Sequence, residues 1–254
     1  MKLTFQGTGD ARQVPVYGCN CKSCYLASVD KTKQRGPASL LIETENVTLL
    51  LDAGGPNLTG KFPPGTLDAI LLTHYHMDHV AGLFHLRWGV NTIIPVWGPD
   101  DKNGCDDLFK HSGILNFNPP LEAFKMISFG SLNITPIPLN HSKPCLGYCI
   151  EQEGLKFAYL TDTIGLPEKS RNFLTEWKAD TLIVDCTHPP QPLRDNPPPP
   201  LNHNDWPTVQ QMIEQISPRH TWLTHISHHM DKWLLSNELP FGVSVAHDNL
   251  ALTL

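Results

Sequence analysis

The sequence predicts a mixed α/β fold in which helices pack outside β-sheets. Strand-length apolar segments dominate the first half of the 254-residue chain, and the second half alternates strands with helices. Apolar residues make up 40% of the composition, which suffices for one large domain with a substantial core or for two small ones. The apolar runs, such as "TLLLDAG" and "AILLTH", are strand-sized, so we expect no membrane span.

The first half is expected to contain short strands separated by glycine- and proline-rich turns. These strands are predicted at 3–7, 39–44, 47–54 and 69–74. A helix is expected from Asp78 to Gly89, because an acidic residue in the first turn suits the helix dipole. A strand over 93–99 and a helix over 106–115 are expected to follow.

The second half is expected to alternate strands and helices around one proline-rich segment. Strands are predicted at 132–142, 155–163, 179–190 and 219–227, and helices at 167–177 and 205–217. The prolines of "PPQPLRDNPPPPLNHND", residues 189–205, exclude a central strand or a helix interior. This segment predicts a stiff surface loop, with a domain boundary as the alternative, and a loop of this length is often functional.

The net charge and the N-terminal sequence weigh against a nucleic-acid-binding protein and against a secreted protein. The net charge is −6 and basic runs are lacking, which weighs against a long nucleic acid as substrate. The N-terminal "MKLTFQGTG" reads as a strand and a turn without the apolar core of a signal peptide, so we expect a cytoplasmic protein. Four of the seven cysteines are scattered and are expected to be small buried residues: Cys105, Cys145, Cys149 and Cys186.

The other three cysteines, Cys19, Cys21 and Cys24, lie within "VYGCNCKSC". In a reducing cytosol such a cluster favours a metal site over disulfides, although a redox role or three unlinked thiols remain alternatives. Structural zinc takes four tetrahedral ligands, typically thiolates with or without histidine. We therefore expect the fold to bring a histidine close to the three sulfurs.

A second motif, "LLTHYHMDH", carries four metal-ligand residues in six positions: His74, His76, Asp78 and His79. In an extended segment His74 and His76 point to the same side, and the other two follow where the expected helix begins. Imidazole and carboxylate suit zinc, manganese or iron. The motif therefore predicts ligands for two adjacent metal ions.

Three further residues of ligand type each end an apolar run. His141 ends "IPLNHS", Asp162 lies in "AYLTDT", and His225 ends "WLTHIS". Each residue alone has an ordinary interpretation, as a hydrogen-bonded histidine or a turn aspartate. Strand ends that converge on one rim of a sandwich would instead join them to the first motif in a dinuclear site.

The H-x-H-x-D-H motif, followed by an isolated histidine, an aspartate and a last histidine, resembles the metallo-β-lactamase superfamily. The resemblance implies an αβ/βα sandwich of two mixed β-sheets flanked by helices, formed by residues 1–254 as a single domain with a structural zinc loop at 14–30. It implies one metal held by His74, His76 and His141, and a second held by Asp78, His79 and His225. Asp162 would bridge the two metals, an arrangement unlike that of the β-lactamases themselves, and Asp52 in "LLLDAG" would have a supporting role.

A narrower resemblance extends along most of the chain. Segments such as "VPVYGCNCKSC", "LLTHYHMDHVAGLFHLRWG", "PLNHSK", "DTIGLPEK" and "LTHISHH" are similar to the PhnP-type cyclic phosphodiesterases of the carbon–phosphorus lyase pathway. That resemblance implies His228 as the fourth ligand of the structural zinc, with His229 as the fallback. It implies manganese as the catalytic metal, while the residues themselves leave zinc open. It also suggests a homodimer, formed near the cysteine cluster.

The implied reaction is the opening of 5-phospho-α-D-ribosyl 1,2-cyclic phosphate to ribose 1,5-bisphosphate in phosphonate catabolism, with 2′,3′-cyclic nucleotides as side substrates. The alkoxide leaving group needs a general acid whose pKa lies near the working pH, which favours histidine. His203 in "PLNHND" is the candidate, because it belongs to none of the metal sets; a surface histidine near the following helix is the alternative. Lys143 could meet a substrate phosphate or be merely exposed, and His188 could line the pocket or hydrogen-bond a metal ligand.

Two other functions compete with this interpretation. A tRNA 3′-processing nuclease of the same superfamily would share the motif, but it needs an extended arm or a basic surface, and no basic insertion separates His141 from Asp162. A non-catalytic metal-binding component of the same pathway is the second alternative. The complete set of seven ligand-type residues weighs against it.

Overall fold

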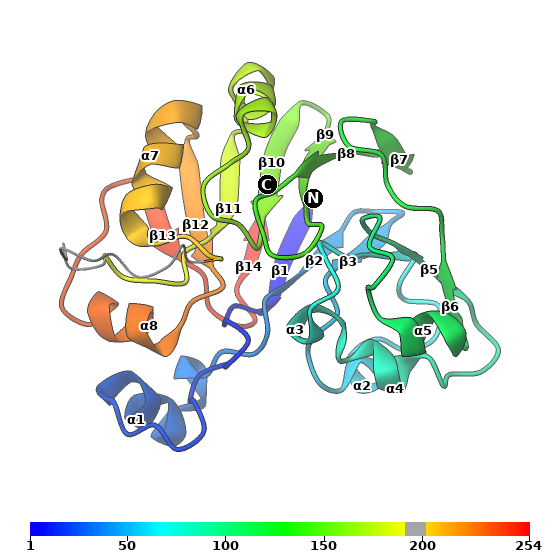
Figure 1. The fold of residues 1–254 in the computed structure, drawn as a ribbon, viewed down its shortest axis with the longest axis horizontal. Coiled ribbons are helices and arrows are strands. Elements are labelled where there is room, and N and C mark those ends of the chain that lie inside the picture. The colour runs from blue at the N-terminus through cyan, green and yellow to red at the C-terminus, as the bar shows by residue number, and fades with distance from the viewer. Residues whose placement is uncertain (191–201) are drawn as a thin grey trace.

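The computed structural model describes residues 1–190 and 202–254, and it contains two mixed seven-stranded sheets flanked by helices (Figure 1). The first sheet has the order β14 (Ala251–Thr253), β1 (Lys2–Gly7), β2 (Ser39–Glu43), β3 (Thr48–Leu51), β4 (Ala69–Leu71), β5 (Ile94–Trp97) and β6 (Leu115–Phe117). The second has the order β13 (Val243–Val245), β12 (His220–Thr224), β11 (Thr181–Asp185), β10 (Leu155–Leu160), β9 (Leu146–Gln152), β8 (Leu132–Pro138) and β7 (Ile127–Phe129). The predicted αβ/βα sandwich is confirmed.

The alternation of side chains along the strands places the core. In β2, Leu40 and Ile42 pack into the cluster between the two sheets, whereas Leu41 packs into the cluster under the outer helices of the first sheet. Successive strand residues point to opposite faces, so a strand that is covered on both sides is apolar throughout. Tyr148 and Phe157 fill the central layer from the second sheet.

The helices cover the outer faces of the sheets. The first sheet carries α2 (Leu58–Lys61), α3 (Met77–Val80), α4 (Leu83–Leu86) and α5 (Asp106–Lys110). The second carries α6 (Glu168–Trp177), α7 (Trp206–Ile216) and α8 (His228–Leu234). Helix α1 (Lys22–Val29) lies beside α8 (Figure 1), and the 3₁₀ turn η1 (Lys31–Lys33) lies against α1.

Strand direction brings the chemistry to one edge. Strands β3 to β6 are parallel, and so are β10 to β13. Strand β8 is antiparallel to β9, which is antiparallel to β10, so β8 runs in the same direction as β10. The carboxyl ends of parallel strands meet at one edge, and the loops that follow them lie side by side.

Several predicted elements were too long. The expected helix from Asp78 to Gly89 is two separate turns, α3 and α4, because Ala53 bonds to both flanks of the break: its N–H donates to His79 O (2.8 Å) and its carbonyl accepts from Gly82 N (2.9 Å). The expected helix over 106–115 ends at Lys110, since Gly113 adopts the left-handed conformation (φ 59°) before β6.

Other predictions differ at their ends or were missing. The expected strands over 132–142 and 155–163 end at Pro138 and Leu160, so the ligand-type residues lie on the loops beyond. The sequence pattern did not predict β6, β7, β9, β13, β14, α1, α2, α8 or η1. Within the predicted loop at 189–205, residues 191–201 lie outside the described residues. In the described ranges, the structure contains no helix with the length and apolarity needed to cross a bilayer.

Candidate metal centres

The seven ligand-type residues predicted from the sequence lie together at the carboxyl ends of the strands. The segment after β4 supplies His74, His76, Asp78 and His79, and the loop after β8 supplies His141. Asp162 follows β10, and His225 follows β12 directly. They form two groups, in each of which the ligand atoms lie within 4.8 Å of one another: His74, His76 and His141, and Asp78, His79, Asp162 and His225.

The first group consists of three imidazoles. His76 Nδ1 lies 2.9 Å from His74 Nε2 and 3.0 Å from His141 Nε2. The Nδ1 of His141 faces outward, 3.1 Å from the carbonyl oxygen of Asn202, and that of His74 lies 3.0 Å from Thr73 Oγ1. These oxygen partners place the ring proton of His74 and of His141 on Nδ1. The lone pairs of their Nε2 atoms then face Nδ1 of His76.

The second group combines two imidazoles with two carboxylates. His79 Nε2 lies 3.3 Å from both Asp78 Oδ2 and Asp162 Oδ2. His225 Nε2 lies 3.3 Å from Asp162 Oδ1 and 3.6 Å from Asp78 Oδ2. Asp162 Oδ2 is also 3.7 Å from His74 Nε2, so this carboxylate stands between the two groups.

Buried oxygens fix the outer nitrogens of the second group. The Nδ1 of His79 lies 2.9 Å from Asp52 Oδ2, and Asp52 also accepts hydrogen bonds from Thr73 N (2.8 Å) and Thr73 Oγ1. The Nδ1 of His225 lies 2.8 Å from Thr187 Oγ1, whose hydroxyl donates to the carbonyl of His225. Asp52 therefore has the supporting position that the sequence comparison implied, because it orients His79.

These residues fit a pair of divalent cations. Within residues 1–190 and 202–254, His79 Nε2, His225 Nε2 and Asp162 Oδ1 are buried without a hydrogen-bond partner. Buried polar atoms are normally paired, so three such atoms facing one point need a further group. Imidazole nitrogens and carboxylate oxygens suit zinc, manganese or iron.

The electrostatics of the centre favour positive charge. Burial lowers the pKa of His225, but Asp162 and Asp78 outweigh that effect and raise it to about 9. Burial raises the pKa of Asp162, whereas His225 and His79 hold it well below its usual range. The carboxylates therefore stay ionised at neutral pH and stabilise cations between them.

The predicted general acid, His203, has a partner that sequence reasoning missed. Its Nδ1 lies 3.1 Å from Oδ2 of the fully buried Asp185 and 3.8 Å from Asp162 Oδ2. Asp185 also accepts hydrogen bonds from the backbone N–H groups of Thr163 and Asn204, both 3.0 Å away. The sequence did contain a signal for Asp185, because this residue ends the apolar run "TLIVD" just as Asp162 ends "AYLTD".

Two weaker candidates lie at the margin of the centre. Lys143 is neither free nor fully exposed, since its Nζ donates to Asp101 Oδ2 at 2.9 Å. The backbone of His188 is held by Asn204 and Trp206, and its ring centroid lies 6.4 Å from that of His203. His188 therefore sits beside His203 and away from the two groups of ligand atoms.

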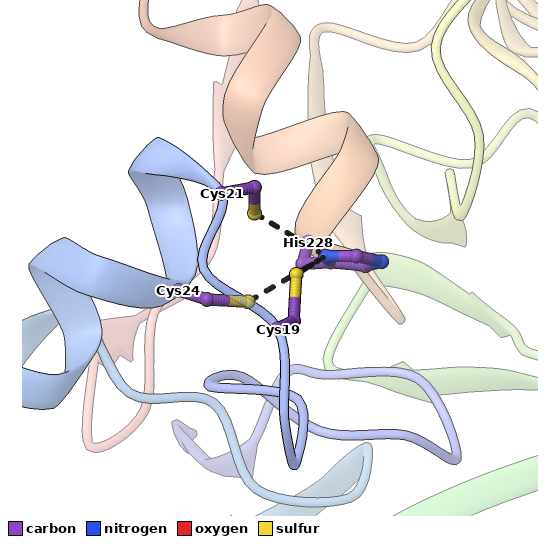
Figure 2. A group of neighbouring side chains, drawn as sticks. All are labelled: Cys19, Cys21, Cys24 and His228. Atoms are coloured by element: carbon purple, nitrogen blue, oxygen red, sulfur yellow. Dashed lines mark hydrogen bonds between the residues drawn. The ribbon is translucent and has the colours of Figure 1, made fainter.

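The cysteine cluster converges on His228, as Figure 2 shows. His228 Nδ1 lies 3.4 Å from the sulfurs of Cys19 and Cys21 and 3.5 Å from that of Cys24. The four ligand atoms lie within 4.8 Å of one another, and the set of three thiols and one imidazole suits zinc. His229, the alternative ligand, belongs to no group of converging ligand atoms in the described ranges.

Local contacts prepare this cluster. Ser23 Oγ donates to the carbonyl of His228 (2.7 Å), which ties the start of α1 to the start of α8. Burial raises the pKa of Cys21, but hydrogen bonds from Ser23, the Cys24 N–H and His228 outweigh it and lower that pKa to about 6. A thiolate is the form that binds metal, so Cys21 is near its binding form at neutral pH, whereas burial raises the pKa of Cys24 to about 12 and zinc would have to displace its proton.

Comparisons with known proteins agree with this geometry. The chain superimposes on the crystal structure of a diphosphatase of the PhnP family with a TM-score of 0.80 and 25% identity, covering 100% of this chain and 97% of the other. It is 27% identical over 250 residues to the octanoyltransferase of Porphyromonas gingivalis, covering 90% of this chain and 46% of that protein. It is 29% identical over 131 residues to ribonuclease Z of Methanopyrus kandleri, covering 47% of this chain and 46% of that protein.

These curated relatives are longer proteins, and the matched part of this chain spans less than half the length of each. A family profile described as a β-lactamase superfamily domain matches residues 49–226, well over half of the chain. That range runs from β3 to the residue after His225 and contains all seven ligand-type residues at the strand ends. The chain belongs to the β-lactamase superfamily and has the metallo-β-lactamase fold.

Proposed function

We propose that the chain is a metal-dependent phosphodiesterase that opens a small cyclic phosphate. One observation carries the proposal: Asp162 Oδ2 contacts His79 of one ligand group (3.3 Å) and His74 of the other (3.7 Å), so two metal ions would share one carboxylate. The likeness to a diphosphatase of the PhnP family supports the choice of a phosphate compound as substrate. The proposed substrate is 5-phospho-α-D-ribosyl 1,2-cyclic phosphate, which would yield α-D-ribose 1,5-bisphosphate in phosphonate catabolism, with 2′,3′-cyclic nucleotides as side substrates.

Two divalent ions, manganese by analogy or zinc, would supply Lewis acidity at neutral pH. The three imidazoles of the first group would hold one ion, and Asp78, His79 and His225 the other, with Asp162 between them. Asp52 and Thr187 keep the outer ring nitrogens of His79 and His225 protonated and direct the inner nitrogens toward the ions. These contacts orient the ligand atoms of both histidines.

His203 would protonate the departing alkoxide. Asp185 accepts a hydrogen bond from Nδ1 of His203, which leaves Nε2 as the atom that can transfer a proton to the leaving oxygen. The buried carboxylate of Asp185 stabilises the imidazolium form until the transfer. His203 then remains as the neutral ring with its proton on Nδ1.

We further propose that Cys19, Cys21, Cys24 and His228 hold a structural zinc ion.

We also propose that the protein is a homodimer. The cysteine loop carries three exposed apolar side chains, those of Tyr17, Tyr25 and Val29, which would be covered in a dimer. Light scattering on the wild type and on a Tyr17→Ser, Tyr25→Ser double variant tests the dimer. A monomeric wild type would refute it.

An activity panel on metal-analysed protein tests the proposed function. The panel contains 5-phospho-α-D-ribosyl 1,2-cyclic phosphate, adenosine 2′,3′-cyclic phosphate, bis(p-nitrophenyl) phosphate and a precursor tRNA, each with manganese or zinc. We expect the cyclic ribose phosphate to have the highest kcat/KM. Cleavage of the precursor tRNA alone would identify a nuclease, and inactivity on every substrate would identify a non-catalytic metal-binding protein.

A diphosphate is the second candidate substrate. The solved structure with 25% identity and nearly complete coverage is a diphosphatase, and the same ligand set could act on a phosphoanhydride. Adding a nucleoside diphosphate sugar to the panel separates the two activities. A higher kcat/KM for this compound than for the cyclic phosphate would favour the diphosphatase.

A further inference from the structure

A groove of about 470 Å³ is lined in part by His188 and plays no part in the mechanism described above. Its described lining contains the basic side chains of His188, His229 and Lys232 and no carboxylate. Trp233 provides an aromatic wall, and Ser236 and Asn237 add polar side chains. In a chain of net charge −6, a groove lined in this way favours an anion.

The groove adjoins the catalytic histidine. His188 lines it, and the ring of His188 lies 6.4 Å from that of His203. The backbone of His188 donates to Asn204 O (3.1 Å) and accepts from Trp206 N (3.0 Å), so the residue is held in place on both sides. A ligand that reached from His203 across His188 would enter the groove.

The other basic residues are positioned by the cysteine cluster. His229 follows the ligand-type residue His228, and their ring centroids are 3.9 Å apart. Cys19, Cys21 and Cys24 surround His228 (Figure 2). The hydroxyl of Ser23 donates to the carbonyl of His228, so the first turn of α8 is fixed to the cysteine loop. Lys232 follows His228 by four residues in α8, which is one helical turn farther along.

The geometry points to a subsite in this groove for a non-reacting phosphate group of the substrate, bound by Lys232 and the imidazoles of His188 and His229. This inference rests on the proposed function and deepens it, because it assigns the part of the substrate that does not react. An ammonium group with neighbouring N–H donors recognises phosphate oxygens by charge-assisted hydrogen bonds. His188 would then bind the remote phosphate at the end of the groove nearest His203.

The surroundings of His188 favour its neutral form. Burial lowers the pKa of His188, His203 and Arg12 lower it further, and Asp185 and Asp10 oppose them. A neutral imidazole at this position offers one N–H donor without a charge of its own. Lys232 would then supply most of the charge that neutralises the phosphate.

A matched pair of substrates tests the subsite: 5-phospho-α-D-ribosyl 1,2-cyclic phosphate and α-D-ribosyl 1,2-cyclic phosphate, which lacks the remote phosphate. With the metal-loaded protein, Lys232→Gln should raise KM for the phosphorylated compound about tenfold and leave its kcat unchanged. KM for the compound without the phosphate should change by less than about twofold, because a charged hydrogen bond is lost only where the phosphate is present. Lys169→Gln, which removes an exposed lysine on α6, is the control and should change neither value.

Equal effects of Lys232→Gln on both compounds, or no effect on either, would overturn the subsite. A second measurement keeps this test separate from the proposed function, namely calorimetric binding of ribose 5-phosphate to the wild type, Lys232→Gln and Lys169→Gln proteins. If the wild type hydrolyses neither cyclic phosphate, the proposed function fails. The subsite then stands only if ribose 5-phosphate binds the Lys232→Gln protein more weakly than the other two, and it falls if all three bind equally or none binds.

Discussion

Nδ1 of His203 lies 3.1 Å from Oδ2 of Asp185, a carboxylate that is fully buried between two backbone N–H donors. Asp185 ends β11, and His203 lies after the last proline of the segment 189–205, so the pair joins two loops at the edge of the dinuclear centre. The contact fixes which ring nitrogen of His203 is free for proton transfer. It also suggests how each partner can be tested.

Replacing His203 by glutamine should lower kcat for a cyclic ribose phosphate by about 10²–10⁴-fold, the usual contribution of a general acid. The loss should be much smaller for bis(p-nitrophenyl) phosphate, because nitrophenolate leaves without a proton. The metal content should equal that of the wild type, as measured by mass spectrometry. His111→Gln, at an exposed position, is the control. Loss of metal from His203→Gln would contradict the general-acid role, as would equal losses on the two substrates.

Asp185→Asn should lower kcat for the cyclic phosphate and spare bis(p-nitrophenyl) phosphate, as His203→Gln does, because Asp185 acts through His203. The neutral amide no longer stabilises the imidazolium, and it leaves one of the two backbone donors with a poorer acceptor. The free energy of unfolding should fall by about 1–3 kcal/mol, as measured in urea. The His203→Gln, Asp185→Asn double variant should be little slower than either single variant. Additive losses in kcat would show that the two residues act independently.

Asp52→Asn should weaken metal binding about 10- to 100-fold, because the amide no longer orients and polarises His79 as the carboxylate does. The backbone should tolerate the change, since Asp52 has a φ of 58° and asparagine adopts that conformation readily. Competition with a chelator of known affinity measures the effect. Asp106→Asn, at an exposed position on α5, should bind metal as the wild type does. Unchanged affinity in Asp52→Asn would show that the contact with His79 is not needed for metal binding.

Cys21→Ser should remove one zinc ion per chain and leave the dinuclear centre loaded. A hydroxyl replaces a thiolate ligand, so the tie between the cysteine loop and α8 weakens. If the tie is worth about 2 kcal/mol, Tm should fall by about 4–8 °C in a chain of this length. Elemental analysis and thermal unfolding measure the two effects, with Cys105→Ser as the control outside the cluster. An unchanged zinc content and Tm would exclude the structural zinc site.

The position of a histidine or aspartate at the end of an apolar run was sufficient to predict the ligand-type side chains. His74, His141, Asp162 and His225 each follow an apolar run, and a run of this kind becomes a buried strand with its end at the sheet edge. The same rule would have found Asp185 at the end of "TLIVD". The helix predicted from Asp78 to Gly89 was wrong because backbone bonds to Ala53, remote in sequence, divide it into two turns.

The sequence by itself determined the fold class and which residues have metal-ligand chemistry, because periodicity and residue type are local properties. Only the tertiary structure decided that His228 rather than His229 faces the three sulfurs, although the two are neighbours in the chain. It also decided the pairing of His203 with Asp185 and brought Lys232 and His188 into the lining of one groove. These relationships join residues that are far apart in the sequence, and burial and packing of the whole chain set the distances between them.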